Sequence, residues 1–581
     1  MKKTEFRQNI WVVASEISET IHSPISPRFE AITVINVQTS ELIEVSASDV
    51  RVLTKFPIPL DGTCLLICYD CVKFLNAMRA EGWPLPEHLI DLRSEFLCIT
   101  NGSDRHFGTG LNGAMLSCGL PATFNEPLSD WPGCTNNNAF EPSAESVTLS
   151  CKKKAIGCAA LFDFLHKYIE FDFALLRGMY SIAASAIENN GVPLDHELLE
   201  LVATHWDEIK QRLIDDIDAA YSVFRDGKFD SQLWAAWLKT HGIAWPTSVD
   251  GLDLSDASFK SMAKLHPDIA PVRWLKTCVE SGSPDGIAIH RDGRSRAPLA
   301  TFSSSTSRNQ PSTKRSVFGR ASWTRGFVRP TPGYGIAYID WAQQEFGIAA
   351  SLSSDLRMQE AYCSGDPYLK FGIQSGILPT HATRDTHPGQ RELFKQSVLA
   401  IQYGIGAESL AEQTGQTVSA AVQMLQLHRN LYSTFWAWSD EIVTEALLGG
   451  KIWTAFGWYL HTNAKSNERS LRNFPMQANG AEMLRLACIQ LVDSGVRVCA
   501  TMHDALLIEA PIATLQHEIA MTQKIMAQAS KDVLGGFEIQ TSVQTCVYPN
   551  RFTNTRNSEM WNKVMAAVGQ LQSTQKFREV A

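Results

Sequence analysis

The sequence lacks most of the features that would place it outside ordinary intracellular globular proteins. It contains no run of about 18 apolar residues, as a membrane-spanning helix requires, and its first residues lack the apolar core of a signal peptide. The 13 cysteines are odd in number and scattered, which argues against a secreted disulfide framework. Cys68 and Cys71 form one close pair, but no second ligand pair for zinc follows. We therefore expect a soluble, cytoplasmic protein with reduced thiols.

Positive charge is also scarce. The 581 residues include 52 Lys and Arg against 61 Asp and Glu, a formal net charge of −9. This balance argues against a protein that coats nucleic acid indiscriminately, because affinity for phosphate comes from clustered Lys and Arg. One stretch differs: residues 293–339, here called the basic segment, hold eight basic residues and no acidic one. The eight are Arg294, Arg296, Arg308, Lys314, Arg315, Arg320, Arg325 and Arg329.

The pattern along the chain predicts several domains. At about 150 residues per domain, the length suffices for three or four. Residues 10–100 mix strand-like apolar runs with a helical stretch, whereas long amphipathic helices dominate residues 171–290. Helices are expected at 355–450 and, after a loop or hairpin, at 475–495. Residues 334–352 should form a strand and a helix, and residues 496–511 two strands joined by a tight turn.

Three segments combine residues that could carry chemistry. IDWAQQEFG places Asp340 at the end of an apolar strand, and MHDALLIEA places Asp504 at a turn between apolar strands. Either carboxylate alone is more often a helix cap or a turn former. The third segment, RELFKQSVLAIQYGIG, spaces Arg391, Lys395, Leu399 and Tyr403 four residues apart, so they share one helix face. Such a face could bind a triphosphate through its cations and a base or sugar at its other end.

Taken together, these segments resemble the three polymerase motifs of the family A DNA polymerases, the bacterial DNA polymerase I type. IDWAQQEFGIAA resembles motif A, RELFKQSVLAIQYG motif B and MHD motif C, in the family's order. FSSSTSRNQPS resembles the family's template–primer segment, and RSLRNFPMQANGAEM resembles a further DNA-binding helix start. The resemblance covers residues 171–548.

The resemblance implies an α+β fold with two parts. Residues 1–165 would form an RNase H-like α/β domain related to the 3′–5′ exonuclease domain. Residues 166–581 would form a right-hand polymerase domain, with a thumb at about 171–290, a palm at about 291–354 and 451–581, and fingers at about 355–450. No length remains for a separate 5′-nuclease domain.

The resemblance also implies a reaction, the addition of deoxynucleotides to a primer 3′ end with primer–template DNA and dNTPs as partners. Asp340 and Asp504, with the backbone carbonyl of Trp341, would hold two Mg²⁺ ions, for which Mn²⁺ may substitute, since hard cations prefer oxygen ligands. Arg391 and Lys395 would bind the triphosphate, and Lys395 would protonate the pyrophosphate. No membrane partner is expected, and no accessory protein can be assigned.

Other residues receive binding roles by the same resemblance. Glu345 would be a steric gate against ribonucleotides, and Tyr403 would lie under the sugar and templating base. Leu399 replaces the aromatic residue usual in motif B, and Ala505 replaces the Glu usual after motif C; these changes bear on nucleotide affinity and positioning. The expected DNA-binding residues are Arg308, Asn309, Gln310, Lys314, Arg315, Arg325, Arg469, Asn473, Gln477 and His503.

The amino-terminal region departs further from the family pattern. Glu16 is present, but Ala14 stands where the family has its partner aspartate. Asp70 matches the second exonuclease motif, whereas Ser150 and Lys154 stand at the Tyr and Asp positions of the third. A lysine would place a cation where a metal ion must bind. We therefore predict an exonuclease-like fold without proofreading activity.

Two other functions remain open at this point. A single-subunit RNA polymerase would share the two aspartates and the motif B Lys and Tyr, but Glu345 disfavours it. A catalytically inactive DNA-binding protein is the other alternative, which the intact Asp340, Lys395 and Asp504 argue against. Whether the enzyme would serve replication, repair or lesion bypass, in a bacterial cell or a phage-infected host, cannot be read from the sequence.

Overall fold

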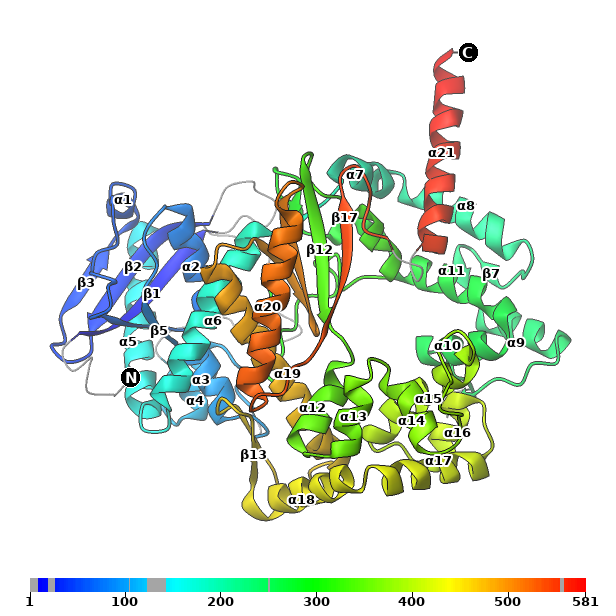
Figure 1. Ribbon diagram of the computed structural model, residues 1–581. Helices are drawn as coiled ribbons and strands as arrows, with labels where there is room; N and C mark the ends of the chain where they lie inside the picture. Colours follow the sequence, from blue (N-terminus) through cyan, green and yellow to red (C-terminus); the bar gives the residue numbers. More distant parts are fainter. Residues whose placement is uncertain are drawn as a thin grey trace.

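A computed structural model describes residues 9–18, 27–103, 105–122, 143–248, 251–553 and 558–580. Two sheets, each covered by helices, lie in different parts of the molecule, and a helical block faces the second of them (Figure 1). The predicted α+β class is confirmed. Within the described residues, every helix is too short or too polar to cross a membrane.

The amino-terminal sheet has five strands in the order β3-β2-β1-β4-β5. Strands β2 and β3 run antiparallel and β4 and β5 parallel to their neighbours. Residues alternate between its faces: Val13 and Leu66 pack towards α2, whereas Val12 and Ile67 pack towards α4 and α5. The elements are β1 Ile10–Ser18, β2 Arg28–Asn36, β3 Leu42–Val45, α1 Ala47–Val50, β4 Leu65–Cys68, α2 Cys71–Ala80, β5 His88–Asp91, α3 Leu92–Ile99, α4 Leu111–Ser117 and α5 Ala144–Leu165.

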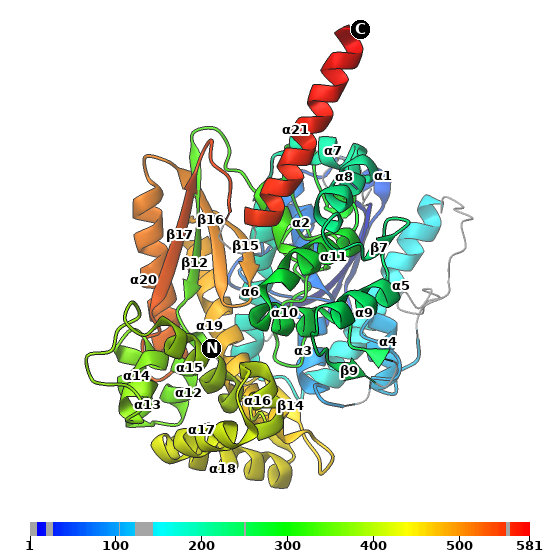
Figure 2. The ribbon, with the colours of Figure 1, turned by 90° about the vertical axis from the view of Figure 1, so that its right-hand side faces the viewer.

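The run of helices that follows begins with α6 (Phe171–Asn190), which packs against β5 and α2, and its later members lie on the side of the molecule that faces the viewer in Figure 2. Its outer part has a small aromatic core of its own, in which Trp234 and Phe259 are fully buried. The helices are α6 Phe171–Asn190, α7 His196–Thr204, α8 Trp206–Asp218, α9 Ser231–Thr240, α10 Asp256–Leu265 and α11 Ala270–Ser281. The carboxy-terminal helix α21 (Ser558–Val580) packs against α8 and projects past it.

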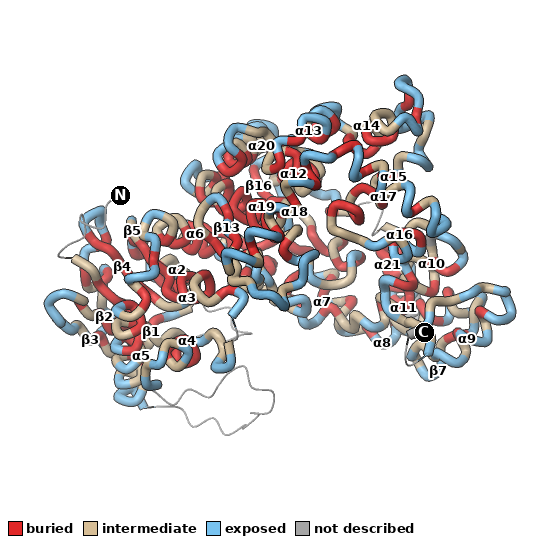
Figure 3. Tube along the Cα trace, turned by 90° about the horizontal axis from the view of Figure 1, so that it is seen from below, coloured by how far each residue is buried: buried red, intermediate tan, exposed pale blue. Residues whose placement is uncertain are grey.

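The second sheet is antiparallel, with strand order β15-β16-β12-β17. Helices α19 and α20 pack against each other beside it, and buried residues concentrate in the two sheets and the helices that cover them (Figure 3). Helix α19 begins at Glu468 and contains Pro475, so the helix expected from residue 475 starts earlier. The elements are β12 Tyr334–Trp341, α19 Glu468–Asp493, β15 Val498–Met502, β16 Ala505–Pro511, α20 Leu515–Val533 and β17 Thr541–Val547.

The helical block lies between β12 and α19 in the sequence and faces the end of the second sheet. A buried aromatic cluster that includes Phe371, Tyr432 and Phe435 holds its helices together. The block ends in the hairpin of β13 (Lys451–Trp453) and β14 (Tyr459–His461). Its helices are α12 Gln344–Leu352, α13 Leu356–Cys363, α14 Pro367–Gln374, α15 Pro388–Gln402, α16 Ala407–Thr414, α17 Val418–Leu431 and α18 Ser433–Gly449.

Candidate active site

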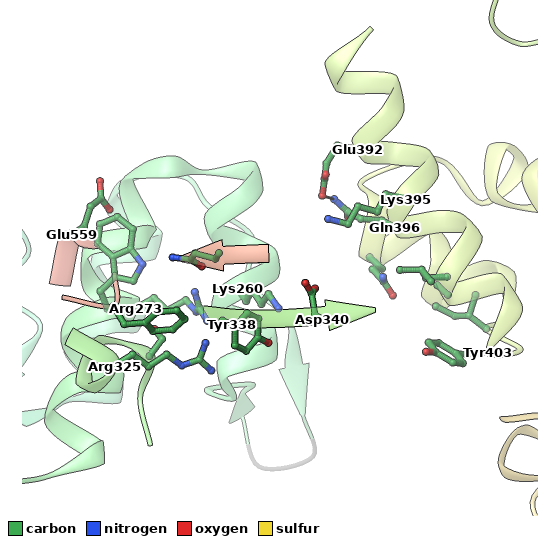
Figure 4. A pocket seen from close by; sticks show the side chains of 18 of the residues that line it. Lys260, Arg273, Arg325, Tyr338, Asp340, Glu392, Lys395, Gln396, Tyr403 and Glu559 are labelled. Carbon is green, nitrogen blue, oxygen red and sulfur yellow. Dashed lines mark hydrogen bonds between the residues drawn. The ribbon is translucent and has the colours of Figure 1, made fainter. Parts of the chain in front are cut away.

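A cavity of about 1200 Å³, here called the central cavity, lies between the second sheet, the helical block and helices α10 and α11. Asp340, at the end of β12, faces Lys395 and Gln396 of α15 across it (Figure 4). The residues that line it are Lys260, Arg273, Trp274, Ser322, Arg325, Tyr338, Asp340, Glu392, Lys395, Gln396, Leu399, Ala400, Tyr403, Ile405, Gln413, Arg469, Gln544, Phe552 and Glu559.

Two carboxylates meet at the edge of the second sheet. Asp340 pairs in register with Ala505 on the adjacent strand, and the backbone N–H of Trp341 donates to the Asp504 carbonyl over 3.2 Å. His503 adopts a left-handed conformation (φ 47°) in the turn between β15 and β16, which brings Asp504 to the end of the hairpin. The two aspartates therefore come from neighbouring strands.

The electrostatics of this pair suit a bound cation. Burial raises the pKa of the Asp504 carboxyl, and the negative charge of Asp340 raises it further. The Asp340 carboxylate accepts a hydrogen bond from the Ser542 hydroxyl on β17, which is a neutral donor and leaves its charge uncompensated. The described residues contain no group of three or more His, Cys, Asp or Glu placed to hold a metal ion. Two carboxylates plus oxygens from a substrate could still complete a Mg²⁺ site, because Mg²⁺ is commonly held in that way.

Helix α15 divides the predicted nucleotide-binding residues between two directions. Lys395, Leu399 and Tyr403 line the central cavity. Arg391 is held at the side, where its guanidinium forms an ion pair with Asp366 and lies 6.0 Å from the centre of the Tyr368 ring. Three of the four residues therefore line the cavity, whereas the carboxylate of Asp366 at the start of α14 binds the fourth, Arg391.

Glu345, the predicted gate, lies in the first turn of α12 and is held at both ends. Its carboxylate forms an ion pair with Arg308 over 3.2 Å, and its carbonyl accepts a hydrogen bond from Gln402 over 3.0 Å. Both Glu345 and Arg308 have side chains about one-fifth exposed (21% and 22%). The pair is thus partly exposed, although neither residue is among those that line the central cavity.

The predicted DNA-binding residues do not all reach the central cavity. Arg325 and Arg469 line it. Asn309 is tied to the body of the protein, since its amide donates to the Tyr180 and Thr501 hydroxyls over 2.6 and 3.1 Å. Besides Arg308, the remaining six are exposed or half-buried and lie outside the lining: Gln310, Lys314, Arg315, Asn473, Gln477 and His503.

The basic segment carries less free charge than its composition suggests. Arg294 pairs with Glu509 over 2.9 Å, Arg296 with Asp292 over 2.6 Å, and Arg329 with Asp195 over 2.9 Å. The acids come from outside the segment, so a count within it cannot reveal them. Of its eight cations, Arg325 lines the central cavity.

Several lining residues were missed in the sequence. Lys260 and Arg273 come from α10 and α11, and Gln544 comes from β17, far from the recognised motifs. Only tertiary packing brings these residues to the cavity. Tyr338 could have been predicted from the sequence, because it lies two positions before Asp340 and therefore on the same face of the strand.

A second cavity, of about 500 Å³, lies in the amino-terminal region beside the end of β1. Lys154 Nζ contacts the two carboxylate oxygens of Glu16 over 3.0 and 3.2 Å, and the Ser150 hydroxyl donates to the same carboxylate over 2.9 Å. Ala14 and Asp70 also line this cavity. The ammonium group therefore occupies the space next to the carboxylate that a metal ion would need.

The fold matches that of a known polymerase domain. The solved structure described as the POL domain of Pol1 from M. smegmatis in complex with DNA primer-template and dNTP superposes with a TM-score of 0.72, covering 93% of this chain and 96% of that chain at 18% identity. The predicted right-hand polymerase fold is thus confirmed.

Sequence comparison finds similarity to one family. Residues 303–547 match the model of DNA polymerase family A. DNA polymerase I of Deinococcus radiodurans is 25% identical over 251 residues, 41% of this chain and 25% of that protein. DNA polymerase I of Chloroflexus aurantiacus is 23% identical over 403 residues (63% and 41%), and the DNA polymerase of Mycobacterium phage D29 is 26% identical over 219 residues (37% and 35%). The chain therefore spans well under half of these relatives.

Proposed function

We propose that the protein is a template-directed DNA polymerase that extends a primer 3′ end with deoxynucleotides in the cytoplasm of a bacterial cell or a phage-infected host. The observation that carries the proposal is the meeting of Asp340 and Asp504 at the ends of adjacent strands, with Asp340 opposite Lys395 across the central cavity. Carboxylates on one wall and a cation on the other suit a reaction that joins a primer end to a triphosphate.

The carboxylates define where metal ions would bind. Family A DNA polymerases generally use divalent metal ions. Asp340, Asp504 and the carbonyl of Trp341 would hold two Mg²⁺ ions, or Mn²⁺ in their place, through hard oxygen donors. Bound ions would lower the pKa of the primer hydroxyl and stabilise charge on the phosphates. The Trp341 side chain is buried and its indole N–H donates to the Met526 carbonyl, so only the backbone of this residue is available.

The nucleotide would lie along α15. Lys395 would contact the phosphates and protonate the leaving pyrophosphate, because its side chain faces Asp340 across the cavity. Arg391 would join it, and Leu399 and Tyr403 would contact the base and sugar. Glu345 would exclude a ribose 2′-hydroxyl, since that group would collide with the side chain that Arg308 holds in place.

The proposed DNA-binding surface surrounds this site. Arg325 and Arg469 would contact the backbone of the duplex from the cavity walls. Residues at about 171–290 would act as the thumb, residues at about 291–354 and 451–581 as the palm, and residues at about 355–450 as the fingers. Closure of the fingers on a paired nucleotide would assemble the site.

The amino-terminal region, residues 1–165, would lack proofreading activity. Two-metal hydrolysis needs several carboxylates that are free to bind metal. Here Glu16 is already neutralised by Lys154, and Ala14 offers no ligand. The region would keep the exonuclease-like fold for another purpose.

Primer extension with dNTPs and rNTPs offered separately tests the polymerase proposal. We expect extension with dNTPs, strong discrimination against rNTPs, and no extension by Asp340→Asn. Asp532→Asn, on the exposed face of α20, is the matched control and should retain activity. Preference for rNTPs would indicate an RNA polymerase, and DNA binding without extension would indicate an inactive DNA-binding protein.

A further inference from the structure

The loop that leads into the predicted template–primer segment is held in an unfavourable backbone conformation. Ala300, Phe302 and Ser307 have φ angles of 48°, 57° and 59°. Residues with a Cβ rarely adopt such left-handed conformations, because the side chain approaches the backbone carbonyl. Three within eight residues persist only if surrounding groups fix them. The loop, residues 300–308, therefore depends on contacts from outside itself.

The amino-terminal region supplies a central contact through Asn101, just after α3. The Asn101 side-chain amide donates to the Ser305 carbonyl over 2.7 Å and to the Tyr459 carbonyl over 2.8 Å. The backbone carbonyl of Asn101 accepts a hydrogen bond from the His461 backbone N–H over 2.8 Å. Asn101 is 2% exposed, so water cannot replace these bonds at low cost. One side chain thus joins the loop to the β13–β14 hairpin.

Two further side chains, Trp458 and Arg485, form hydrogen bonds to the same loop. The Trp458 indole N–H donates to the Ser305 carbonyl over 2.9 Å, and its ring stacks on Phe302 at 5.6 Å. Arg485 of α19 donates to the Ser307 carbonyl over 2.9 Å. The Ser305 carbonyl therefore accepts one bond from the amino-terminal region and one from the polymerase region, and the two regions meet at this atom.

The end of the loop reaches the proposed nucleotide site. Arg308 follows directly after Ser307 and forms the ion pair with Glu345. Movement of the loop would move the guanidinium that holds this carboxylate. The position of Arg308 is thus connected to Asn101 through the short backbone from Ser305 to Arg308, which includes the left-handed Ser307.

We propose that Asn101 is a positioning residue through which the amino-terminal region fixes the 300–308 loop for nucleotide selection. The inference rests on the proposed polymerase function and extends it. It gives the exonuclease-like region a structural task in synthesis that requires no metal ion. The active groups remain Glu345 and Arg308, and Asn101 acts through them.

Asn101→Asp and Asn36→Asp form a matched pair of test variants. Asn36 is also buried (3% exposed), but its side-chain oxygen accepts from the N–H groups of Gln38 and Thr39, all within the amino-terminal region. Aspartate at position 36 keeps these acceptors. Aspartate at position 101 cannot donate either hydrogen bond, and its negative charge would lie against the carbonyl oxygens of Ser305 and Tyr459. Asn101→Ser, which retains one hydroxyl donor, is a milder variant should Asn101→Asp fail to fold.

The first measurement is hydrogen exchange in the full-length protein, which does not depend on activity. We expect Asn101→Asp, or Asn101→Ser to a smaller extent, to speed exchange in residues 300–308 and 459–461, and Asn36→Asp to leave both segments unchanged. Unchanged exchange in 300–308 for both position-101 variants would overturn the proposal.

The second measurement is the ratio of kcat/KM for a dNTP to that for the matching rNTP. We expect Asn101→Asp to lower this ratio about tenfold and Asn36→Asp to leave it unchanged. Equal ratios in the two variants would overturn the positioning role. If the unmodified protein fails to extend a primer, the proposed polymerase function is wrong, whereas the exchange experiment still decides whether Asn101 fixes the loop.

Discussion

The central cavity and the amino-terminal cavity both hold acidic residues near strand ends, yet they differ in what lies beside each carboxylate. In the central cavity, Asp340 contacts a serine hydroxyl and lies next to Asp504, so negative charge accumulates. In the amino-terminal cavity, Glu16 contacts the Lys154 ammonium, and the charge is cancelled. A carboxylate therefore indicates a metal site only when the protein itself leaves its charge unpaired.

The largest expected effect is the loss of the central carboxylate pair. Asp504→Asn should lower the rate of nucleotide incorporation by about a thousandfold or more, because a metal-dependent step contributes several kcal/mol. Single-turnover primer extension measures this rate. Glu16→Gln, the equivalent change in the other cavity, should have no effect on it; a comparable loss in Glu16→Gln would break the comparison.

The next effect separates the two cations of α15. Lys395→Ala should lower kcat by about a hundredfold, as expected for loss of a general acid, since Lys395 faces Asp340 across the central cavity. Arg391→Ala should mainly raise KM for the nucleotide, because Arg391 must first leave Asp366. Steady-state kinetics of both variants distinguish these outcomes. A larger loss of kcat in Arg391→Ala would contradict the assignment.

Substitution of the amino-terminal cavity should give it the unpaired carboxylates that distinguish the central cavity. Ala14→Asp with Lys154→Asp would replace the internal cation with two carboxylates beside Glu16. We expect the affinity of this region for Mn²⁺ to rise about tenfold, measured by titration calorimetry. Lys152→Asp is the control on the same helix, since Lys152 pairs with Glu44 at the surface. No gain in the double variant would show that Lys154 is not what prevents metal binding.

The smallest effect concerns Asp91, a carboxyl buried beneath the amino-terminal cavity. Burial, followed by the charge of Asp70, raises its pKa from 3.8 to about 6. Because the folded state binds this proton more tightly, the free energy of unfolding should increase as pH falls from about 6 to about 4. The increase should approach about 1.4 kcal/mol per pH unit.

Denaturant unfolding between pH 4 and 7 tests this dependence. Asp70→Asn should narrow the pH window, because removing the neighbouring charge lowers the Asp91 pKa. The prediction would be contradicted if the free energy of unfolding fell from pH 6 to pH 4 and Asp91→Asn removed that fall.

The sequence was sufficient to predict where a residue lies when its position follows from local structure. Asp340 at a strand end and Asp504 in a hairpin turn lie as expected, because strand alternation and turn chemistry are local. Lys154, which the resemblance placed where a metal ion would bind, lies beside Glu16, but the ion pair between them appears only in the structure.

Other features depended on tertiary contacts that no spacing encodes. The pairing of Arg391 with Asp366 is set by how α14 packs on α15. The neutralisation of Arg294 by Glu509 joins residues more than two hundred positions apart. The bonds of Asn101 to Ser305 and Tyr459 cross between regions in the same way.

Direct measurement of Mn²⁺ binding tests the central claim that the unpaired carboxylates, and not the paired one, hold metal. Electron paramagnetic resonance of the full-length protein, bound to a dideoxy-terminated primer–template and a dNTP so that substrate oxygens can complete the site, would be recorded for the unmodified protein, Asp340→Asn and Glu16→Gln. We predict that Asp340→Asn abolishes the bound Mn²⁺ signal and that Glu16→Gln leaves it unchanged. Loss of the signal in Glu16→Gln, or its persistence in Asp340→Asn, would contradict this account.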